Sequence, residues 1–429
     1  MAGTRSGESS DRSERRAALA WLMTIALGVL AISHGFTGSY RWFVFTGFAV
    51  AIALLPVAVF RDPLAIPPWD LLILVLLPVV DATVYGESIL TGITTYVAVA
   101  AVALIVAVEI DRLTAVRMSH SFAVVLVSLT TLAVAGGWNV AQWVADVAFG
   151  TDYLLDGRSQ DAANRALMIE FAYAAVAGFL AGILFDRSFR SYSESVSERV
   201  APADDSGSAS KSEPIPALIR DRLDIPDETV RRFSRGMQIA LAGLLLFGLF
   251  RRDLTTVVNA GVALAITFLP AILERDARLP LEPGLVFWLT VAVFLHALGS
   301  AGVYALVGQW DSLTHTISAS IVAAAGYAVV RAIDLHTDDV YLPTTVLFAF
   351  ILVFVLAFGV VWELLEFAID ESARLLGFQA VVAQYGLSDT IVDLMFDSAG
   401  AVVAAVWGSF YLTDLSRQIA SRLEGEPDR

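Results

Sequence analysis

Long apolar runs separated by short polar connections dominate the chain. The runs are about 18 to 25 residues long, the length at which an α-helix crosses the hydrocarbon core of a bilayer. The predicted spans cover residues 20–34, 43–60, 69–85, 89–108, 119–142, 167–185, 237–250, 255–273, 283–306, 313–332, 342–367 and 390–412. The pattern predicts an all-α, polytopic membrane helical bundle of about twelve transmembrane helices. The seventh run is short, and it could instead form a re-entrant hairpin with the eighth without changing the later orientations.

The basic residues predict the orientation of these helices. With the N-terminus inside, the tails and even-numbered loops hold 22 of the 28 Lys and Arg residues, and the opposite loops hold 6. Because basic loops stay in the cytoplasm, both termini are expected there, in the cell membrane of a multi-pass protein. The predicted regions are a cytoplasmic tail (1–17), an N-terminal six-helix repeat (18–190), a cytoplasmic linker (191–235), a C-terminal six-helix repeat (236–413) and a second tail (414–429).

The two halves around the linker resemble each other. The segment from Trp138 to Asp146 aligns with the segment from Trp362 to Asp370, 224 residues later, and Glu170 aligns with Asp393 at nearly the same shift. An even number of helices gives both halves the same topology, so the pattern predicts parallel repeats related by an axis along the membrane normal. The alternative is chance similarity between apolar helices, although the aligned polar positions match as well as the apolar ones.

Composition excludes several classes of protein. Of 429 residues, 57% are hydrophobic and 17% are charged, and the mean hydropathy is +0.69; a soluble domain has about 25% charged residues. A soluble enzyme, a disordered chain and a nucleic-acid binder are therefore excluded. The absence of cysteine excludes disulfides and thiolate chemistry. A net charge of −15 with a single lysine, Lys211, suggests a halophile.

Polar groups in the C-terminal half follow helical spacing and form three stripes. Residues spaced at i, i+3, i+4 and i+7 share a helix face. The stripes are Asp311 and His315; Glu363, Glu366 and Asp370; and Asp389, Asp393 and Asp397. The predicted topology brings His315, Glu366 and Asp393 to similar depth near the outer face. A charged residue at the centre of a span costs about 2.5–3.5 kcal/mol, so we expect these side chains to share a polar pocket near the extracellular face.

The N-terminal half has neutral residues at several aligned positions. Glu363 aligns with Asn139, Glu366 with Gln142 and Asp397 with Ala174. Amides keep hydrogen bonds but bind a divalent cation weakly, so we expect a functional C-terminal half and a degenerate N-terminal half. Glu170 and Asp146 stay acidic, so the loss is incomplete. The alternative for both sets is hydrogen bonding between helices.

The residue types suggest roles for these side chains. Carboxylates with one imidazole suit a hard divalent cation such as Mg²⁺, Ca²⁺ or Mn²⁺, and nothing indicates a haem, flavin or nucleotide. The candidate metal ligands are Asp389, Asp393, Asp397 and Glu366, and the candidate catalytic residues are His315, Glu363, Glu366 and Asp393. The candidate substrate-binding residues are Asp311, Arg374 and His296. Arg374 could hold a phosphate or simply pair with Asp370 or Glu371, and His296 could line the pocket or be a core histidine.

At these residues the sequence resembles the YjdF-like and VanZ-like membrane families. Their common pattern is Asp-x3-His at the start of one helix, a Glu-rich helix end, and Asp-x3-(Asn/Asp)-x2-Gly-Ala. Here the pattern corresponds to Asp311 and His315, to Glu363 and Glu366, and to the segment 393–401. The resemblance covers roughly residues 285–410, and it implies a role in envelope or lipid-associated processes.

Three functions fit the sequence. The first is an outer-leaflet enzyme, a transferase or hydrolase, that acts on a membrane lipid or lipid-linked substrate, with lipid attachment to exported lipoproteins as one such task. The second is a cation- or proton-coupled transporter, whose layout would match two parallel halves. The third is a non-catalytic envelope scaffold. None of them requires a nucleic acid.

Overall fold

The structure is a computed structural model that describes residues 3–86, 88–197, 227–276, 281, 283–337, 340–377 and 384–404. Within these residues it is helical, without a β-strand, and ten helices are long and apolar enough to cross a membrane. The expected polytopic helical membrane bundle is therefore confirmed. The chain divides into two compact units, Met1–Ala135 with Ile169–Arg199 and Gly136–Met168 with Val200–Arg429.

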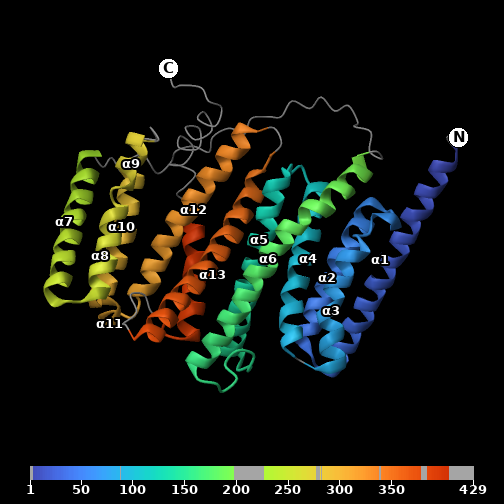
Figure 1. Cartoon of the computed structure of the whole chain (residues 1–429), viewed down its shortest axis with the longest axis horizontal. Helices are drawn as coiled ribbons and strands as arrows, with labels where there is room; N and C mark the ends of the chain where they lie inside the picture. Colours follow the sequence, from blue (N-terminus) through green and yellow to red (C-terminus); the bar gives the residue numbers. More distant parts are fainter. Residues whose placement is uncertain are drawn as a thin grey trace. The chain divides into compact units, whose positions relative to one another are not determined.

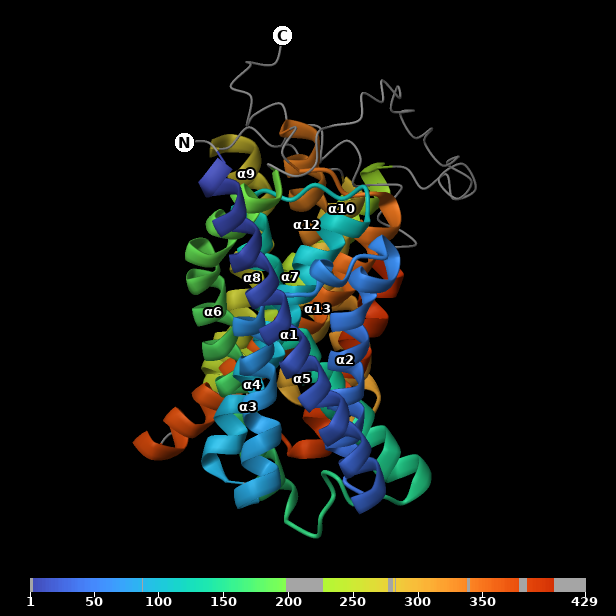
Figure 2. The same ribbon diagram turned by 90° about the vertical axis from the view of Figure 1, so that its right-hand side faces the viewer.

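The first unit contains the helices α1 (Gly3–Thr37), α2 (Tyr40–Phe60), α3 (Trp69–Tyr85) and α4 (Ile89–Leu113), the start of α5 (His120–Phe149) and the later part of α6 (Gln160–Ser197). Helices α1 and α2 pack together, and α3 packs against α1 and α4 (Figure 2). Leu27, Ala49, Val75 and Ala101 form a buried cluster where these helices meet.

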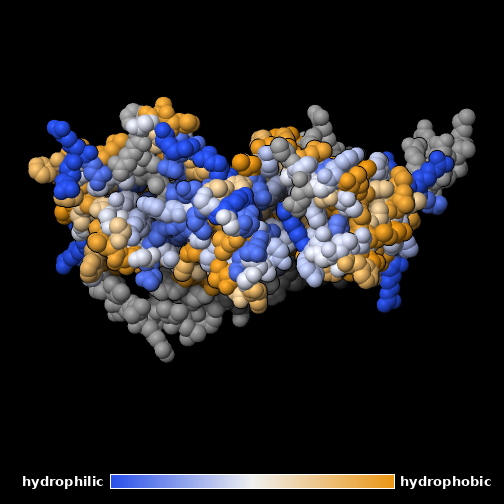
Figure 3. All heavy atoms as spheres, turned by 90° about the horizontal axis from the view of Figure 1, so that it is seen from below, coloured by the Kyte–Doolittle hydropathy of each residue, from blue (hydrophilic) through white to orange (hydrophobic). Residues whose placement is uncertain are grey.

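The second unit contains α7 (Asp227–Arg251), α8 (Leu254–Ile266), α9 (Leu269–Asp276), α10 (Pro283–Leu298), α11 (Tyr304–Leu306), α12 (Trp310–His336), α13 (Thr344–Leu376) and a helix over residues 387–404 (Figure 1). Helix α10 packs against α7, α8 and α12, and α12 packs against α13. Leu241, Ala263 and Ala297 form a buried cluster of α7, α8 and α10. Large apolar side chains are exposed along the helices, for example Leu246 and Phe247 of α7, and the end face drawn in Figure 3 shows both hydrophilic and apolar residues.

The observed helices differ from the predicted spans at particular residues. Helix α7 begins at Asp227 and is 25 residues long, so it is long enough to cross the membrane instead of forming half of a hairpin. Its first turns carry Arg231, Arg232 and Arg235, which hide the helix from a search for apolar runs. The predicted span 255–273 is broken between α8 and α9, because the ring of Pro270 clashes with the carbonyl of residue 266 in a continuous helix.

Two of the twelve predicted spans are short or extend beyond the described residues, whereas the helix bounds agree with the predicted repeat. Helix α3 is 17 residues long and contains Pro78, and the predicted span 390–412 continues past residue 404, outside the described residues. Helix α5 begins at His120 and α13 begins at Thr344, a difference of 224 that equals the shift from Trp138 to Trp362. The helix bounds therefore support the repeat, which stays a prediction.

Candidate functional site

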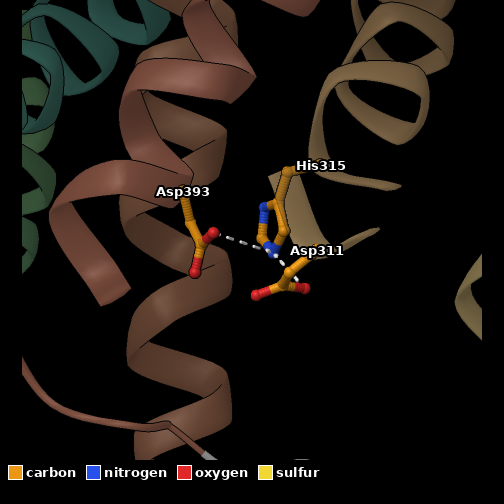
Figure 4. Close-up of side chains that lie close together, drawn as sticks. All are labelled: Asp311, His315 and Asp393. Carbon is orange, nitrogen blue, oxygen red and sulfur yellow. Dashed lines mark ion pairs between the residues drawn. The ribbon is translucent and has the colours of Figure 1, made fainter. Parts of the chain in front are cut away.

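Three side chains from two helices converge at one end of the second unit. Asp311 and His315 lie in the first turns of α12, and Asp393 lies in the second turn of the 387–404 helix. His315 Nε2 is 3.9 Å from Asp311 Oδ1 and 3.7 Å from Asp393 Oδ1. The two carboxylates thus point toward the same ring nitrogen (Figure 4). Of the three residues expected at one depth, His315 and Asp393 lie in this cluster with Asp311, and Glu366 is not part of it.

Small residues allow the helices to come this close. A Cβ at Gly400 would lie 2.9 Å from both the Ala319 Cβ and the Ser320 backbone nitrogen, so the 387–404 helix rests directly on α12. A Cβ at Gly359 of α13 would lie 2.7 Å from Asp397 Oδ2. Real Cβ atoms do not approach other atoms so closely, and a larger residue at either position would push the helices apart. These two glycines therefore set the spacing of the site.

The geometry of the cluster suits a metal ion. One ligand atom from each of Asp311, His315 and Asp393 can be chosen so that all lie within 4.8 Å of one another. Ligand atoms about 2.0–2.3 Å from a shared cation are separated by about 3–4.5 Å. The separations of 3.7 and 3.9 Å fall inside this range. A cation between the three atoms would need little rearrangement of the side chains.

Asp397 orients the imidazole from the other side. Its Oδ1 lies 3.1 Å from His315 Nδ1, within hydrogen-bond distance. When Nδ1–H donates to a carboxylate, the lone pair of the ring stays on Nε2, the atom that faces Asp311 and Asp393. Metal-binding histidines usually have such a second carboxylate partner. Asp397, predicted as a metal ligand, therefore lies where it can hold a ligand in place.

The cluster contains more negative charge than its imidazole can balance. Asp311, Asp393 and Asp397 surround one histidine, and no described residue donates a hydrogen bond to the Asp393 carboxylate. A buried carboxylate without a partner is costly, so such groups take up a cation or a proton. The side chains of Asp393 and His315 are 6% and 14% exposed, whereas that of Asp311 is 30% exposed. The site therefore opens toward solvent or substrate on the Asp311 side.

Glu363 lies beside this cluster at the end of a hydrogen-bond chain. Thr390 Oγ1 donates to Asn164 Oδ1 (3.1 Å), Asn164 Nδ2 donates to Gln384 Oε1 (2.7 Å), and Gln384 Nε2 donates to Glu363 Oε2 (2.7 Å). Glu363 is 1% exposed, and its Oε1 has no hydrogen-bond partner among the residues that the structure describes. A buried carboxylate oxygen without a donor is costly, so Glu363 is a carboxyl group that needs a proton or a cation.

The other predicted residues have local partners. Glu366 is buried, and its Oε1 accepts a hydrogen bond from Trp362 Nε1 (3.0 Å). Asp389 Oδ2 accepts from the backbone nitrogen of Tyr385 (3.1 Å). Arg374 pairs with Glu371 on the surface, so the structure does not bring it to the cluster. Glu366 and Asp389, predicted as metal ligands, are not part of the three-residue cluster.

His296 is connected to α12 through the hydroxyl of Tyr304. Its Nδ1 is 2.9 Å from the hydroxyl of Tyr304, which is 3.3 Å from Thr314 Oγ1, next to His315 in the chain. This contact depends on a π-helical segment, Gly299–Val303, in which Gly302 has φ +123°. The segment turns Tyr304 back toward α10. Such bulges are often found near functional sites.

Sequence reasoning missed the neutral partners of the site. Tyr304, Gln384 and Asn164 have no distinctive spacing from the acidic stripes, and Trp362 could be assigned only to the membrane interface. Two signals were present. Gly299 and Gly302 interrupt an apolar run, which is typical of a bulge, and Gln384 precedes a predicted span within a polar segment.

Comparison with known proteins supports the membrane assignment. Residues 233–414 match the family described as "Predicted membrane protein (DUF2238)", and residues 12–66 match a "Domain of unknown function (DUF8268)". An "Uncharacterized protein" of Thermotoga maritima is 27% identical over 171 residues, which cover 39% of this chain and 84% of that protein. No solved structure matches. The membrane character expected from the family resemblance is confirmed, and the YjdF-like and VanZ-like assignment stays a prediction.

The first match covers the whole cluster. Residues 233–414 include all of α8 to α13 and the 387–404 helix, and thus Asp311, His315 and Asp393. Most of the Thermotoga maritima protein is matched by less than half of this chain. The chain is therefore longer than a protein to which it is similar.

Proposed function

We propose that the chain is a membrane-embedded enzyme that holds a hard divalent cation between Asp311, His315 and Asp393 and acts on a lipid or lipid-linked substrate. The observation that carries the proposal is the arrangement of His315. Its Nδ1 is held by Asp397, and its Nε2 faces two carboxylates at separations that fit a shared cation. Two carboxylates and one imidazole suit Mn²⁺ or Mg²⁺, with Ca²⁺ the third candidate.

The residues of the site have different roles in the proposed reaction. A cation in the cluster would polarise a phosphate or carbonyl oxygen of the substrate. Both nitrogens of His315 are engaged in the cluster, so proton transfer falls to Glu366, whose Oε1 is fixed by Trp362. Asp311, the most exposed of the three cation ligands, lies on the side where substrate enters. The supported reactions are transfer or hydrolysis of a lipid head group and lipid attachment to an exported protein.

The place of the cluster in the unit supports a lipid substrate. Asp311 is in the first turn of α12, Glu366 is in the last third of α13, and Asp393 is near the start of the 387–404 helix. All three positions lie toward one end of their helices, of which α12 and α13 are long enough to span a membrane, and we propose that this end lies near the lipid head groups. Under the predicted orientation, with both termini in the cytoplasm, this end faces the outer leaflet.

Mn²⁺ binding tests the cation site. The full chain in detergent micelles is expected to bind one Mn²⁺, and its electron paramagnetic resonance signal should show coupling to an imidazole nitrogen. His315→Gln should remove the coupling and most of the binding. His34→Gln is the matched control, because His34 is also buried in a helix but bonds only a neutral group, the hydroxyl of Thr83. Normal Mn²⁺ coupling in His315→Gln would overturn the site.

Lipid analysis tests the reaction. In the organism that encodes the chain, a deletion strain is expected to accumulate one lipid or unlipidated exported protein by mass spectrometry, and the wild-type gene should restore the profile. His315→Gln should fail to restore it, while His34→Gln should succeed. An unchanged profile in the deletion strain would refute the enzymatic role.

A coupled transporter is the second candidate, favoured by the interruption of α10. The π-helical segment and the positive φ of Gly302 break this helix beside the cluster, and broken helices line the ion sites of many transporters. Solute uptake into vesicles that depends on a cation gradient, with an unchanged lipid profile in the deletion strain, would select this function instead.

A further inference from the structure

A cleft between α7 and α10 lies away from the carboxylate cluster. It encloses about 500 Å³ and is lined by six residues of one α7 face and by Phe294 of α10. Helix α7 begins at the lined end, and the cluster lies at the opposite end of the unit, where α12 begins. The α7 lining residues are Thr229, Arg232, Phe233, Gly236, Met237 and Ala240. None of these residues takes part in the proposed function.

The lining changes from polar to apolar along the helix. Thr229 and Arg232 provide a hydroxyl and a guanidinium at one end of the cleft. One turn further, Gly236 and Ala240 form a shallow floor, and nothing lies within 4 Å of a Cβ built on Gly236. Phe233, Met237 and Phe294 provide apolar walls. Over about 15 Å of helix the lining thus changes from polar to apolar, which matches a phospholipid with its head group at the polar end and an acyl chain at the apolar end.

Charge selects the kind of lipid. The first turns of α7 carry Arg231, Arg232 and Arg235, and Arg232 pairs with Glu228 at 3.1 Å in an exposed ion pair. Exposed ion pairs are weak, so Arg232 can release Glu228 for a phosphate. Basic pockets between membrane helices bind anionic head groups. The exposed apolar residues beside the cleft, Phe233 at 64% and Ile239 at 74%, indicate that it opens toward the acyl chains.

We propose that this cleft binds an anionic glycerophospholipid, with its phosphate at Arg232 and Thr229 and one acyl chain over Gly236 and Ala240. A second copy of the chain is the competing occupant, because Gly236, Ala240 and Gly243 form a stripe of small residues that could pack against another helix. Such a helix would contact Gly243 as well, whereas Gly243 is not part of the cleft lining.

Native mass spectrometry of the delipidated full chain, with phosphatidylglycerol or phosphatidylcholine added back, tests the proposal. The wild type is expected to retain one phosphatidylglycerol with about fivefold preference over phosphatidylcholine, the effect of one interfacial arginine. Arg232→Gln should reduce this preference to near unity, and Ala240→Leu should remove binding of both lipids. Arg275→Gln, at another exposed pair on the end of α9, should change neither.

The same spectra separate lipid from a protein partner. Gly243→Leu should leave lipid retention intact, since it lies outside the lining. Equal retention of both lipids by the wild type, or full binding by Ala240→Leu, would overturn the proposal. A dimer lost in both Ala240→Leu and Gly243→Leu would assign the face to a second copy. These outcomes do not depend on Mn²⁺ binding at the cluster.

Discussion

The buried carboxylates of the C-terminal half and the aligned carboxylates of the N-terminal half have different hydrogen-bond partners. Asp146 aligns with Asp370, and both of its oxygens are saturated: Oδ1 accepts from Thr151 Oγ1 and the Tyr153 nitrogen, and Oδ2 accepts from the nitrogens of Leu154 and Leu155. Glu170, aligned with Asp393, accepts from the hydroxyl of Tyr96 at 2.8 Å. These two N-terminal carboxylates thus accept hydrogen bonds from described donors, four at Asp146 and one at Glu170.

In the C-terminal half, the carboxylates of Asp311 and Asp393 face one shared imidazole nitrogen instead of a set of hydrogen-bond donors. Asp393 and Asp311 both point to His315 Nε2, and no described residue bonds Glu363 Oε1. Evolution retains such costly arrangements mainly where a charge has a function. The aligned acidic residues are therefore not equivalent, because their partners differ. The difference between the two halves lies in a few neutral residues around these carboxylates.

Removing Asp393 should have the largest effect on cation binding. Asp393→Asn replaces one of the two carboxylate ligands by an amide and is expected to weaken Mn²⁺ binding by about 100-fold or more, because an amide is a poor ligand for a hard cation. Glu170→Gln, the aligned change, should leave binding unaltered. Isothermal titration of both variants measures the contrast. Equal losses would show that the two halves are functionally alike.

Asp397→Asn should have the next largest effect. Residues that orient a metal-binding histidine typically contribute 10- to 100-fold in affinity, so the amide is expected to weaken Mn²⁺ binding by about tenfold while the imidazole coupling survives. Asp146→Asn is the control: it removes a hydrogen-bond acceptor of the N-terminal half and should lower thermal stability without changing affinity. Loss of the imidazole coupling in Asp397→Asn would contradict an orienting role.

Gly400→Ala tests the spacing of the helices. The aligned residue of the N-terminal half is Ala177, so a Cβ is tolerated there, whereas at Gly400 it would meet the α12 backbone. The added methyl is expected to cost about 1–3 kcal/mol of stability and to weaken Mn²⁺ binding several-fold by moving Asp393 from His315. Ala177→Gly should leave the affinity unchanged. Thermal unfolding and Mn²⁺ titration of both variants give the comparison.

Much of the fold followed from the length and polarity of helical segments, and part of the site followed from spacing. Asp311 and His315, one turn apart, and Asp393 could be brought together because even a coarse topology puts adjacent helix ends side by side. Which carboxylate contacts which nitrogen of His315 could not be predicted. That Asp397 contacts Nδ1 while Asp393 faces Nε2 depends on ring orientation and on the close contact at Gly400. Sequence spacing does not contain this information.

The neutral partners depend on irregular backbone, which explains why they were missed. Tyr304 meets His296 only because a π-helical segment separates them, and Gln384 reaches Glu363 from the segment before the 387–404 helix. Helical spacing does not predict which side chains meet where the helix is interrupted. The start of α7 was missed for a different reason, because its arginines lower the hydropathy of a helix that continues into the membrane.

Glu366→Gln should have the smallest effect on the cation and still abolish the reaction. Glu366 is absent from the three-ligand cluster, and its Oε1 is held by Trp362, so Mn²⁺ affinity is expected to change by less than about threefold, as for a residue outside the ligand set. Because an amide cannot transfer a proton at neutral pH, the variant should fail to restore the lipid profile of a deletion strain. Gln142→Glu, the reverse change at the aligned position, should alter neither measurement. If Glu366→Gln restores the lipid profile, Glu366 takes no part in the chemistry. It is then only a hydrogen-bond partner of Trp362, as Glu170 is a hydrogen-bond partner of Tyr96.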